Sequence, residues 1–173
     1  DLIQDMGRFG NTHMGISPSG AADNISLRIG NLLLDNNIND PCIEITLFGG
    51  SYYFNKDAII VLSGSDFSST IDGKIISFYK PLSIKTGQTL SISQTTDGAR
   101  CYLCIKGGFQ VPPTLNSSST HILSKIGGFN GRSLKKKDEI LFSNSNNQNF
   151  NKNKNFHIDN DRSVLSVTKG LQY

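Results

Sequence analysis

Cysteine is scarce in this sequence, with three residues among 173, and long apolar runs are absent. An odd number of cysteines without a visible disulfide framework favours a reducing compartment, so we expect a cytoplasmic protein. No stretch approaches the roughly 18 apolar residues of a membrane-spanning helix, and the first residues do not resemble a signal peptide. The composition therefore argues against a disulfide-rich secreted protein and against a membrane protein.

Charge is also low, because charged residues make up 18% of the chain and the formal net charge is +3. Nucleic-acid-binding proteins usually carry a clustered basic face, which so mild an excess does not indicate. Hydrophobic residues make up 36%, and 173 residues suffice for one domain with a buried core. We expect a globular protein that binds neither nucleic acid nor membrane.

Motifs for metals and phosphates are missing or incomplete. Cys101 and Cys104 have CxxC spacing, but "RCYLCIK" reads as a strand, in which residues three apart point to opposite faces. His121 and His157 lack metal-ligand spacing, and no GxxxxGK[ST] phosphate loop occurs. The sequence therefore predicts two reduced strand cysteines and no metal site.

One helix is predicted, over about Ala21 to Leu34, within "SGAADNISLRIGNLLL". Either Ser19 or Asp23 can cap its N-terminus. Helical spacing places four apolar residues on one stripe: Ile25, Ile29, Leu32 and Leu33. We expect this stripe to face the core.

Short strands are predicted along most of the remaining chain. The apolar or alternating runs are "IEITLF", "SYYF", "AIIVL", "KIISF", "LSIK", "TLSIS", "CYLCI" and "EILF". Turn signals such as Asp72–Gly73, Thr86–Gly87 and Asp97–Gly98 separate them. This regular spacing predicts a mainly antiparallel β fold, a barrel or a sandwich, with one helix near the N-terminus.

Three segments are expected from the composition along the chain. Residues 1–142 form the main unit, and residues 143–161 are an asparagine-rich linker or loop that we expect to be exposed and mobile. Residues 162–173 read as the first strand of a second half, so we expect the chain to be a fragment.

The opening stretch "QDMGRFGNTHMGISPSGAADN", residues 4–24, concentrates potential chemistry in a glycine-rich segment. Arg8 can hold a carboxylate or phosphate, and His13 can exchange a proton near neutral pH. Backbone amides near Ser19 and Gly20 can bind an anion if a helix starts there. Alternatively, Asp5 and Arg8 form a structural ion pair that holds the loop, and His13 fills space.

The same stretch resembles the signature QDxGRxGxxxxGVxxSGAxD of the allophanate hydrolase subunit 2 family. This family is also called biotin-dependent carboxyltransferase, subdomains A and B, and includes the C-subunit of 5-oxoprolinase. Further stretches are similar to family segments in the same order: "IEITLFGG", "VLSGSDFSSTIDGK", "CYLCIKGGFQVPPTLNSSST" and "GGFNGRSLKKKD". The resemblance covers nearly the whole chain and implies a cyclophilin-like barrel.

The resemblance implies chemistry on a small amide or lactam. Family members act with a B-subunit, often together with an A-subunit, in ATP-dependent opening of 5-oxoproline to glutamate, while relatives in urea carboxylase pass a carboxyl group from carboxybiotin to urea. ATP is thus expected in the full complex, and biotin only in a carboxyltransferase. The candidate catalytic residues are Asp5, Arg8, His13 and Asp23; the candidate substrate-binding residues are Gln4, Ser19, Gly20, Gly107 and Gly108.

Several positions depart from the family pattern. Asn116 and Ser118 replace the usual Gly and Arg of a GSRST motif, and Leu171 stands where a proline is expected at the start of the second half. Loss of that arginine removes an anion contact. The sequence therefore also allows a non-catalytic module that binds a kinase inhibitor similar to the B-subunit, or a degraded half of a urea-carboxylase-type enzyme. We expect this chain to be inactive alone.

Overall fold

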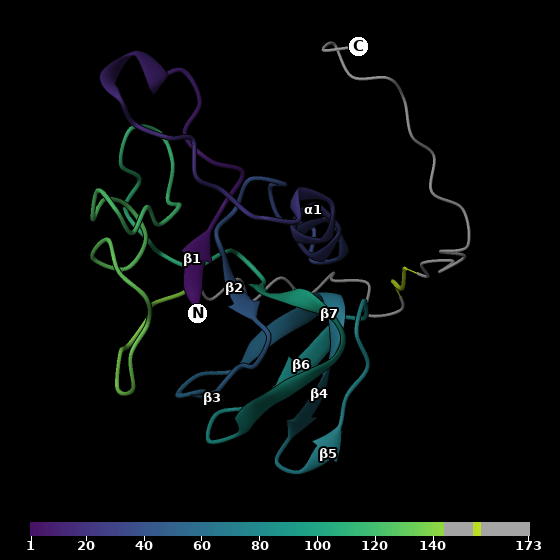
Figure 1. Ribbon diagram of the computed structural model, residues 1–173. Coiled ribbons are helices and arrows are strands. Elements are labelled where there is room, and N and C mark those ends of the chain that lie inside the picture. Colours follow the sequence, from purple (N-terminus) through teal and green to yellow (C-terminus); the bar gives the residue numbers. More distant parts are fainter. Residues whose placement is uncertain (144–153, 157–173) are drawn as a thin grey trace, which may run out of the picture.

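Two long antiparallel strands, β4 (Ala58–Ile71) and β7 (Thr89–Ile105), form the centre of the fold (Figure 1). The computed structural model describes residues 1–143 and 154–156. The two strands pair from Ile60↔Ile105 to Ile71↔Leu90, and their register shifts between Gly64 and Ser69. Such irregularities bend a strand and increase its twist, so both strands curve around the core.

Five shorter strands extend this pair. They are β1 (Leu2–Gln4), β2 (Cys42–Thr46), β3 (Ser51–Tyr53), β5 (Lys74–Ile75) and β6 (Leu82–Ile84). The order is β1-β2-β7-β4-β5, with β3 also on β7 and β6 also on β4, and every pair is antiparallel. The predicted mainly antiparallel β fold with one helix is confirmed. The described strands form an open path from β1 to β5 and do not close into a barrel.

Strand boundaries differ from the predicted ones in informative places. "TLSIS" and "CYLCI" belong to one strand, β7, and Asp97–Gly98 lies inside it, because Asp97 pairs with Asp66 where the register shifts. "EILF" forms no strand and contributes only a bridge between Phe142 and Phe109. The Asp72–Gly73 turn between β4 and β5 is confirmed, with φ of 48° and 79°.

Helix α1 (Asn24–Leu33) is shorter than predicted and presents a different face to the sheet. Ile25 is 71% exposed and Leu32 is 56% exposed, so the predicted apolar stripe is wrong at these two positions. The buried face follows i, i+3, i+4, i+7 spacing through Leu27, Gly30, Asn31 and Leu34. A Cβ on Gly30 would lie 2.5 Å from Cys104 Sγ, so glycine permits the close approach of helix and sheet.

The sheet separates two apolar clusters. Cys101 belongs to the larger cluster, whereas Cys104 belongs to the cluster beneath α1, which confirms that the two thiols diverge. Cys104 Sγ lies 3.0 Å from Cys42 Sγ, a proximity that no local sequence pattern indicates. All three cysteines are free and buried.

The remaining described chain forms loops beside β1. Residues 5–20, which include the 3-10 helix η1 (Thr12–Met14), lie next to the loops of residues 110–142 in Figure 1. No helix in the described ranges is long and apolar enough to cross a membrane. Of the predicted linker, only Ser143 and residues 154–156 are described, and the predicted strand at 162–173 lies outside the described residues.

Candidate functional site

Asp5 joins the opening stretch to a serine-rich loop far along the chain. Its carboxylate accepts hydrogen bonds from Gly7 N (2.7 Å), Ser117 Oγ (2.7 Å), Ser118 N (2.6 Å) and Ser119 Oγ (2.5 Å). The residue is 3% exposed. Oδ1 accepts three of these bonds and Oδ2 accepts one, so both oxygens are engaged within the protein, and the contacts tie together segments more than a hundred residues apart.

Arg8 is buried in the same junction, at 1% exposure. Its guanidinium donates to Thr114 O (3.4 Å), Ser19 Oγ (3.1 Å) and Ser119 O. Burial lowers the pKa of Arg8, and the nearby charge of Asp5 partly opposes this shift. We call these residues the Asp5 junction: Asp5, Arg8, Ser19, Ser117, Ser118 and Ser119.

His13 lies apart from this junction. It is exposed on η1, and its Nδ1 is 3.0 Å from Gly10 O. Among the described residues it forms no hydrogen bond with Asp5 or Arg8. The structure therefore brings Asp5 and Arg8 together and leaves His13 on a surface loop.

Ser19 and Gly20 precede the helix by several residues, because α1 begins at Asn24 rather than near Ala21. Gly20 has a φ of +95°, and a Cβ there would lie 2.9 Å from the Met6 backbone. This position requires glycine for the close crossing of two loop segments. The anion site predicted from a helix start at Ser19–Gly20 loses its geometric basis.

Asp23 and the Gly107–Gly108 pair lie at opposite ends of α1. Asp23 caps the N-terminus by accepting from Ile25 N (3.1 Å) and Ser26 N (3.0 Å). Gly107 N donates to Asn36 Oδ1 (2.9 Å), beyond the C-terminus. A ten-residue helix is about 15 Å long, so these predicted residues are not brought together.

Gln4 leads to residues that the sequence reasoning missed. Its Nε2 donates to Thr120 O (3.3 Å), while its buried Oε1 has no hydrogen-bond partner among the described residues. Buried polar atoms normally have partners, so an orphaned one calls for an explanation. The residue itself is 4% exposed.

Glu44 lies on β2, two positions along the chain from the residue that pairs with Gln4. Its Oε2 accepts from Ala22 N (2.8 Å) and from Tyr102 Oη (2.8 Å), and Tyr102 Oη accepts from Asp23 N (2.7 Å). Burial and Glu44 together raise the pKa of Tyr102, so the phenol stays protonated. The sequence signal was an acid inside the apolar strand "CIEIT", an unusual place for a charge.

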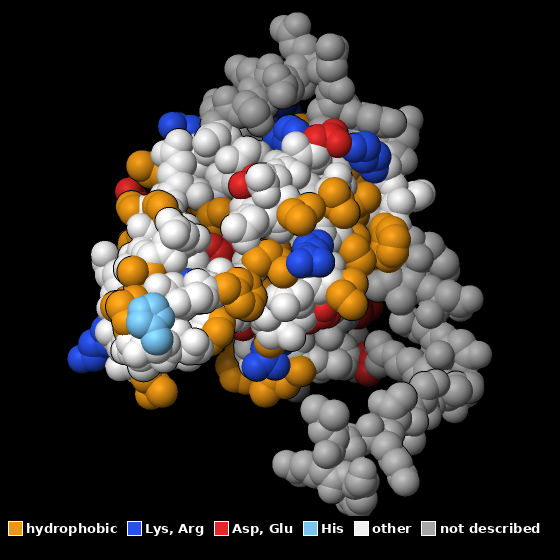
Figure 2. All heavy atoms as spheres, turned by 90° about the horizontal axis from the view of Figure 1, so that it is seen from above, with side chains coloured by type: hydrophobic (Ala, Val, Ile, Leu, Met, Phe, Trp, Pro, Cys, Tyr) orange, Lys and Arg blue, Asp and Glu red, His pale blue; other side chains and the backbone are white. Residues whose placement is uncertain are grey.

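Other surfaces contain none of the predicted residues. A groove of about 950 Å³ lies between β3 and residues 134–142, with Phe54, Phe109 and Phe142 in its lining. Within the described ranges, no three His, Cys, Asp or Glu side chains are placed to hold a metal ion. In Figure 2 the Lys and Arg side chains of the viewed face are scattered among apolar and uncharged ones, rather than gathered in a basic patch.

Sequence and structure comparisons give concordant results. The family model described as carboxyltransferase domain, subdomain A and B, matches residues 14–173. Urea amidolyase of Saccharomyces cerevisiae is 44% identical over 147 residues, which cover 84% of this chain and 8% of that protein. The C-subunit of 5-oxoprolinase from Haemophilus influenzae is 39% identical over 142 residues, which cover 82% of this chain and 46% of that protein.

The fold comparison agrees with the sequence comparison. The crystal structure of urea amidolyase from K. lactis superposes with a TM-score of 0.80 at 39% identity, over 82% of this chain and 9% of that chain. The chain thus spans less than half the length of the 5-oxoprolinase relative, and a much smaller share of the urea amidolyases.

Proposed function

Because the chain belongs to the carboxyltransferase domain, subdomain A and B, family, we propose that it forms part of a component that acts on a small amide or lactam. The first candidate is the C-subunit of an ATP-dependent 5-oxoprolinase, which opens the lactam of 5-oxoproline to give glutamate. The similarity to the 5-oxoprolinase relative supports this candidate. In this proposal the enzyme also needs a second half of this protein and a B-subunit, often together with an A-subunit.

The observation that carries the proposal is the unpartnered Oε1 of Gln4. Amides, lactams and urea all carry an N–H group, and a buried carbonyl acceptor without a donor gains most from such a ligand. Gln4 also opens the family signature, and it lies directly beside the Asp5 junction in sequence. We propose that Gln4 contacts substrate.

The other predicted residues divide into two proposed roles. Asp5 and Arg8 use their hydrogen-bonding capacity within the protein, which supports a positioning role for both. Asp23 caps the helix, and exposed His13 is the predicted residue with a free ring nitrogen for proton exchange. A catalytic role for these four residues, and substrate binding by Ser19, Gly20, Gly107 and Gly108, remain proposals.

ATP does not fit the start of α1. A phosphate group binds a helix N-terminus through free amides, but Glu44, Tyr102 and Asp23 already accept from the amides there. Two carboxylates at this position would also repel a phosphate. We therefore assign ATP to the assembled complex and route no step through it here, and we invoke biotin only for a carboxyltransferase.

Urea carboxylation is the second candidate. It is favoured by the 44% identity to urea amidolyase and by the TM-score of 0.80 to the K. lactis structure. In that case the same site would hold urea for carboxyl transfer. A cyclophilin-like closure of the sheet, a cytoplasmic location and the division into 1–142, 143–161 and 162–173 remain predictions for either candidate.

The test is turnover by a full-length protein that carries this chain and its second half, assembled with the other subunits of the complex. With ATP and 5-oxoproline, the first candidate predicts glutamate release, and with ATP, bicarbonate, urea and a biotinylated carrier, the second predicts carboxylated urea. The chain alone should release no glutamate above background. Tight binding of the B-subunit without either product would overturn both enzymatic candidates and favour the non-catalytic interaction module.

A further inference from the structure

One face of the sheet carries a row of polar side chains beneath the start of α1. The register pairs Glu44 with both Leu2 and Tyr102, Cys42 with Gln4, and Thr46 with Arg100. Side chains alternate along strands, so Gln4, Glu44, Tyr102 and Arg100 share one face. We call these four residues the Glu44 row.

Glu44 is hydrogen-bonded through one oxygen and forms only an ion pair through the other. Its Oε2 receives the bonds from Ala22 N and Tyr102 Oη, which fix the carboxylate against the loop before α1. Its Oε1 has Arg100 Nε at 3.7 Å, outside hydrogen-bond distance, and no hydrogen bond among the described residues. An ionised carboxylate in such a position keeps acceptor capacity for a ligand.

Arg100 supplies the complementary donor. Its Nε is buried and has no hydrogen-bond partner among the described residues, although 38% of its side chain is exposed. Arg132 shows what a closed pair looks like in this protein, because it binds Asp138 through two bonds of 2.7 and 2.8 Å. The distance from Arg100 Nε to Glu44 Oε1 is 3.7 Å, about 1 Å longer than the Arg132–Asp138 bonds, although opposite charges attract.

The two buried orphan atoms of the described chain, Gln4 Oε1 and Arg100 Nε, therefore lie on the same face, on either side of Glu44. Ala22, in the loop above Glu44, is exposed, so the row lies close to solvent at this end. The row thus offers hydrogen-bond acceptors at Glu44 and Gln4 and a donor at Arg100. A matching ligand both donates and accepts hydrogen bonds along one edge.

We propose that the Glu44 row binds the cis amide edge of the substrate, with its N–H donating to Glu44 Oε1 and its carbonyl oxygen accepting from Arg100 Nε. A lactam ring holds N–H and C=O on the same edge, and urea presents the same pair, with further N–H groups for Gln4 Oε1. This inference rests on the proposed function and names the residues that select its substrate class. It also places a guanidinium at the carbonyl oxygen, where charge develops when the carbonyl carbon is attacked.

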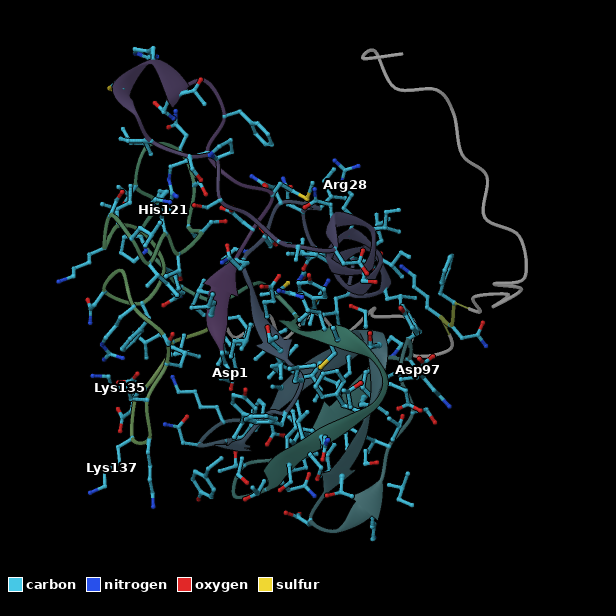
Figure 3. The ribbon with its side chains drawn as sticks, viewed as in Figure 1. Asp1, Arg28, Asp97, His121, Lys135 and Lys137 are labelled. Atoms are coloured by element: carbon cyan, nitrogen blue, oxygen red, sulfur yellow. The ribbon has the colours of Figure 1, made fainter. Side chains whose placement is uncertain are left out.

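The first measurement follows the Nε–H signals of ¹⁵N-labelled arginine in the full-length protein assembled with its B-subunit. Arg100→Lys identifies the Arg100 signal by its loss. Titration with 5-oxoproline or with urea should shift that signal and leave the Arg28 signal unmoved, since Arg28 projects from α1 on the outside of the molecule (Figure 3). N-methyl-5-oxoproline, which lacks the N–H, should produce no shift at the same concentration.

The second measurement is affinity for the same probes in Glu44→Gln and Arg100→Lys. The glutamine carbonyl can still accept from Ala22 and Tyr102, but its amide group then presents N–H to the substrate N–H. We expect Kd to rise about 10- to 100-fold in each variant, in keeping with the cost of one unmade buried hydrogen bond. The matched exposed variants Glu139→Gln and Arg28→Gln should leave Kd within about twofold.

The outcomes separate this inference from the proposed function. If the complex turns over 5-oxoproline or urea while Kd and the Arg100 signal do not respond, the row is structural and the inference is wrong. If the complex turns over neither probe, the signal and Kd still decide whether the row binds an amide edge. Should Glu44→Gln fail to fold, Arg100→Lys alone decides, because the Arg100 side chain is 38% exposed whereas that of Glu44 is 7% exposed.

Discussion

The Asp5 junction and the Glu44 row begin one residue apart, yet they differ in how many of their polar atoms have hydrogen-bond partners. At the junction, the Asp5 carboxylate accepts four bonds and Arg8 donates three. In the row, two buried atoms have no hydrogen-bond partner among the described residues, and one carboxylate oxygen is held by an ion pair of 3.7 Å without a hydrogen bond. A group committed to the fold has no capacity left for a ligand, whereas a group that must bind a ligand keeps some free.

The difference changes how the signature segment is interpreted. Its conspicuous acid and arginine connect the first loop to residues 114–119, and so hold β1 in place beside β2. That placement sets Gln4 on the face that carries Glu44. In this proposal the junction affects the chemistry by holding β1 in position, whereas the row affects it by contacting the substrate.

The largest effect is expected at Arg8. Arg8→Ala removes three hydrogen bonds and leaves Asp5 buried beside an empty space, so we expect the free energy of unfolding to fall by about 3–5 kcal/mol. Unfolding should be followed in guanidinium chloride, because urea is a candidate ligand. The folded fraction should keep its kcat/KM in the full complex.

Arg132→Ala is the matched control, since its pair with Asp138 is partly exposed and should contribute far less to stability than the buried Arg8. If Arg8→Ala instead leaves Tm unchanged and lowers kcat/KM by about a hundredfold, Arg8 contacts the substrate. That result would reverse the roles assigned to the two regions.

The next effect concerns two buried cysteines, Cys42 on the helix-covered face of the sheet and Cys101 on the opposite face. Burial raises the pKa of Cys42 and of Cys101, so both remain thiols in the folded protein. The unfolded thiols release protons above about pH 8.5, so stability is fully present below that pH and falls above it, by up to about 1.4 kcal/mol per pH unit for each thiol. Guanidinium unfolding between about pH 7 and pH 10 measures the slope.

Cys42→Ala should reduce that slope, because one titrating thiol is gone, although it also lowers stability at neutral pH by removing buried sulfur. Alkylation by iodoacetamide should be slow in the folded protein and fast after unfolding. Rapid alkylation of Cys42 under native conditions would show that the space under α1 opens to solvent.

The smallest effect is expected at Asp23. Asp23→Ala removes the cap of α1 and should lower the free energy of unfolding by about 1–2 kcal/mol, whereas Asp23→Asn keeps a capping oxygen and should cost only a few tenths. Both variants should be assayed in the full complex. A loss of turnover in Asp23→Asn with unchanged stability would support the predicted catalytic role over a purely capping role.

The fold class was predictable from the sequence because strand runs and turn dipeptides are local signals. The predictions failed for features that are set by tertiary packing, namely the buried face of α1 and the extent of β7. Gly30 and Asn31 lie on the buried face of α1 and Ile25 lies outside, because close contact with Cys104 needs a small residue there. β7 continues through Asp97–Gly98 because a strand can absorb that dipeptide in an irregular pairing with β4.

The candidate site shows the same limit. The signature marks Gln4, Asp5 and Arg8 as special, but only the pairing of β1 with β2 and of β2 with β7 reveals their neighbours. Glu44 and Arg100 lie 56 residues apart in sequence, and although Glu44 lies within the family-like stretch "IEITLFGG", no sequence pattern links the two residues. The fold decides which acidic side chains have hydrogen-bond donors and which residues supply them. No local sequence pattern contains this information.

The most direct test compares two neighbours, Asp5→Asn and Gln4→Leu, in the protein assembled with the proposed B-subunit. Both the free energy of unfolding in guanidinium chloride and the Kd for 5-oxoproline and urea are measured. Asp5→Asn should lose about 2–4 kcal/mol of stability and keep its affinity once folded, since it disrupts a carboxylate whose two oxygens are both engaged within the protein. Gln4→Leu should change stability by less than about 1 kcal/mol, because it removes an orphaned acceptor together with one long hydrogen bond to Thr120 O, and should weaken binding about tenfold. The opposite pattern, stability lost at Gln4 and affinity lost at Asp5, would contradict the account.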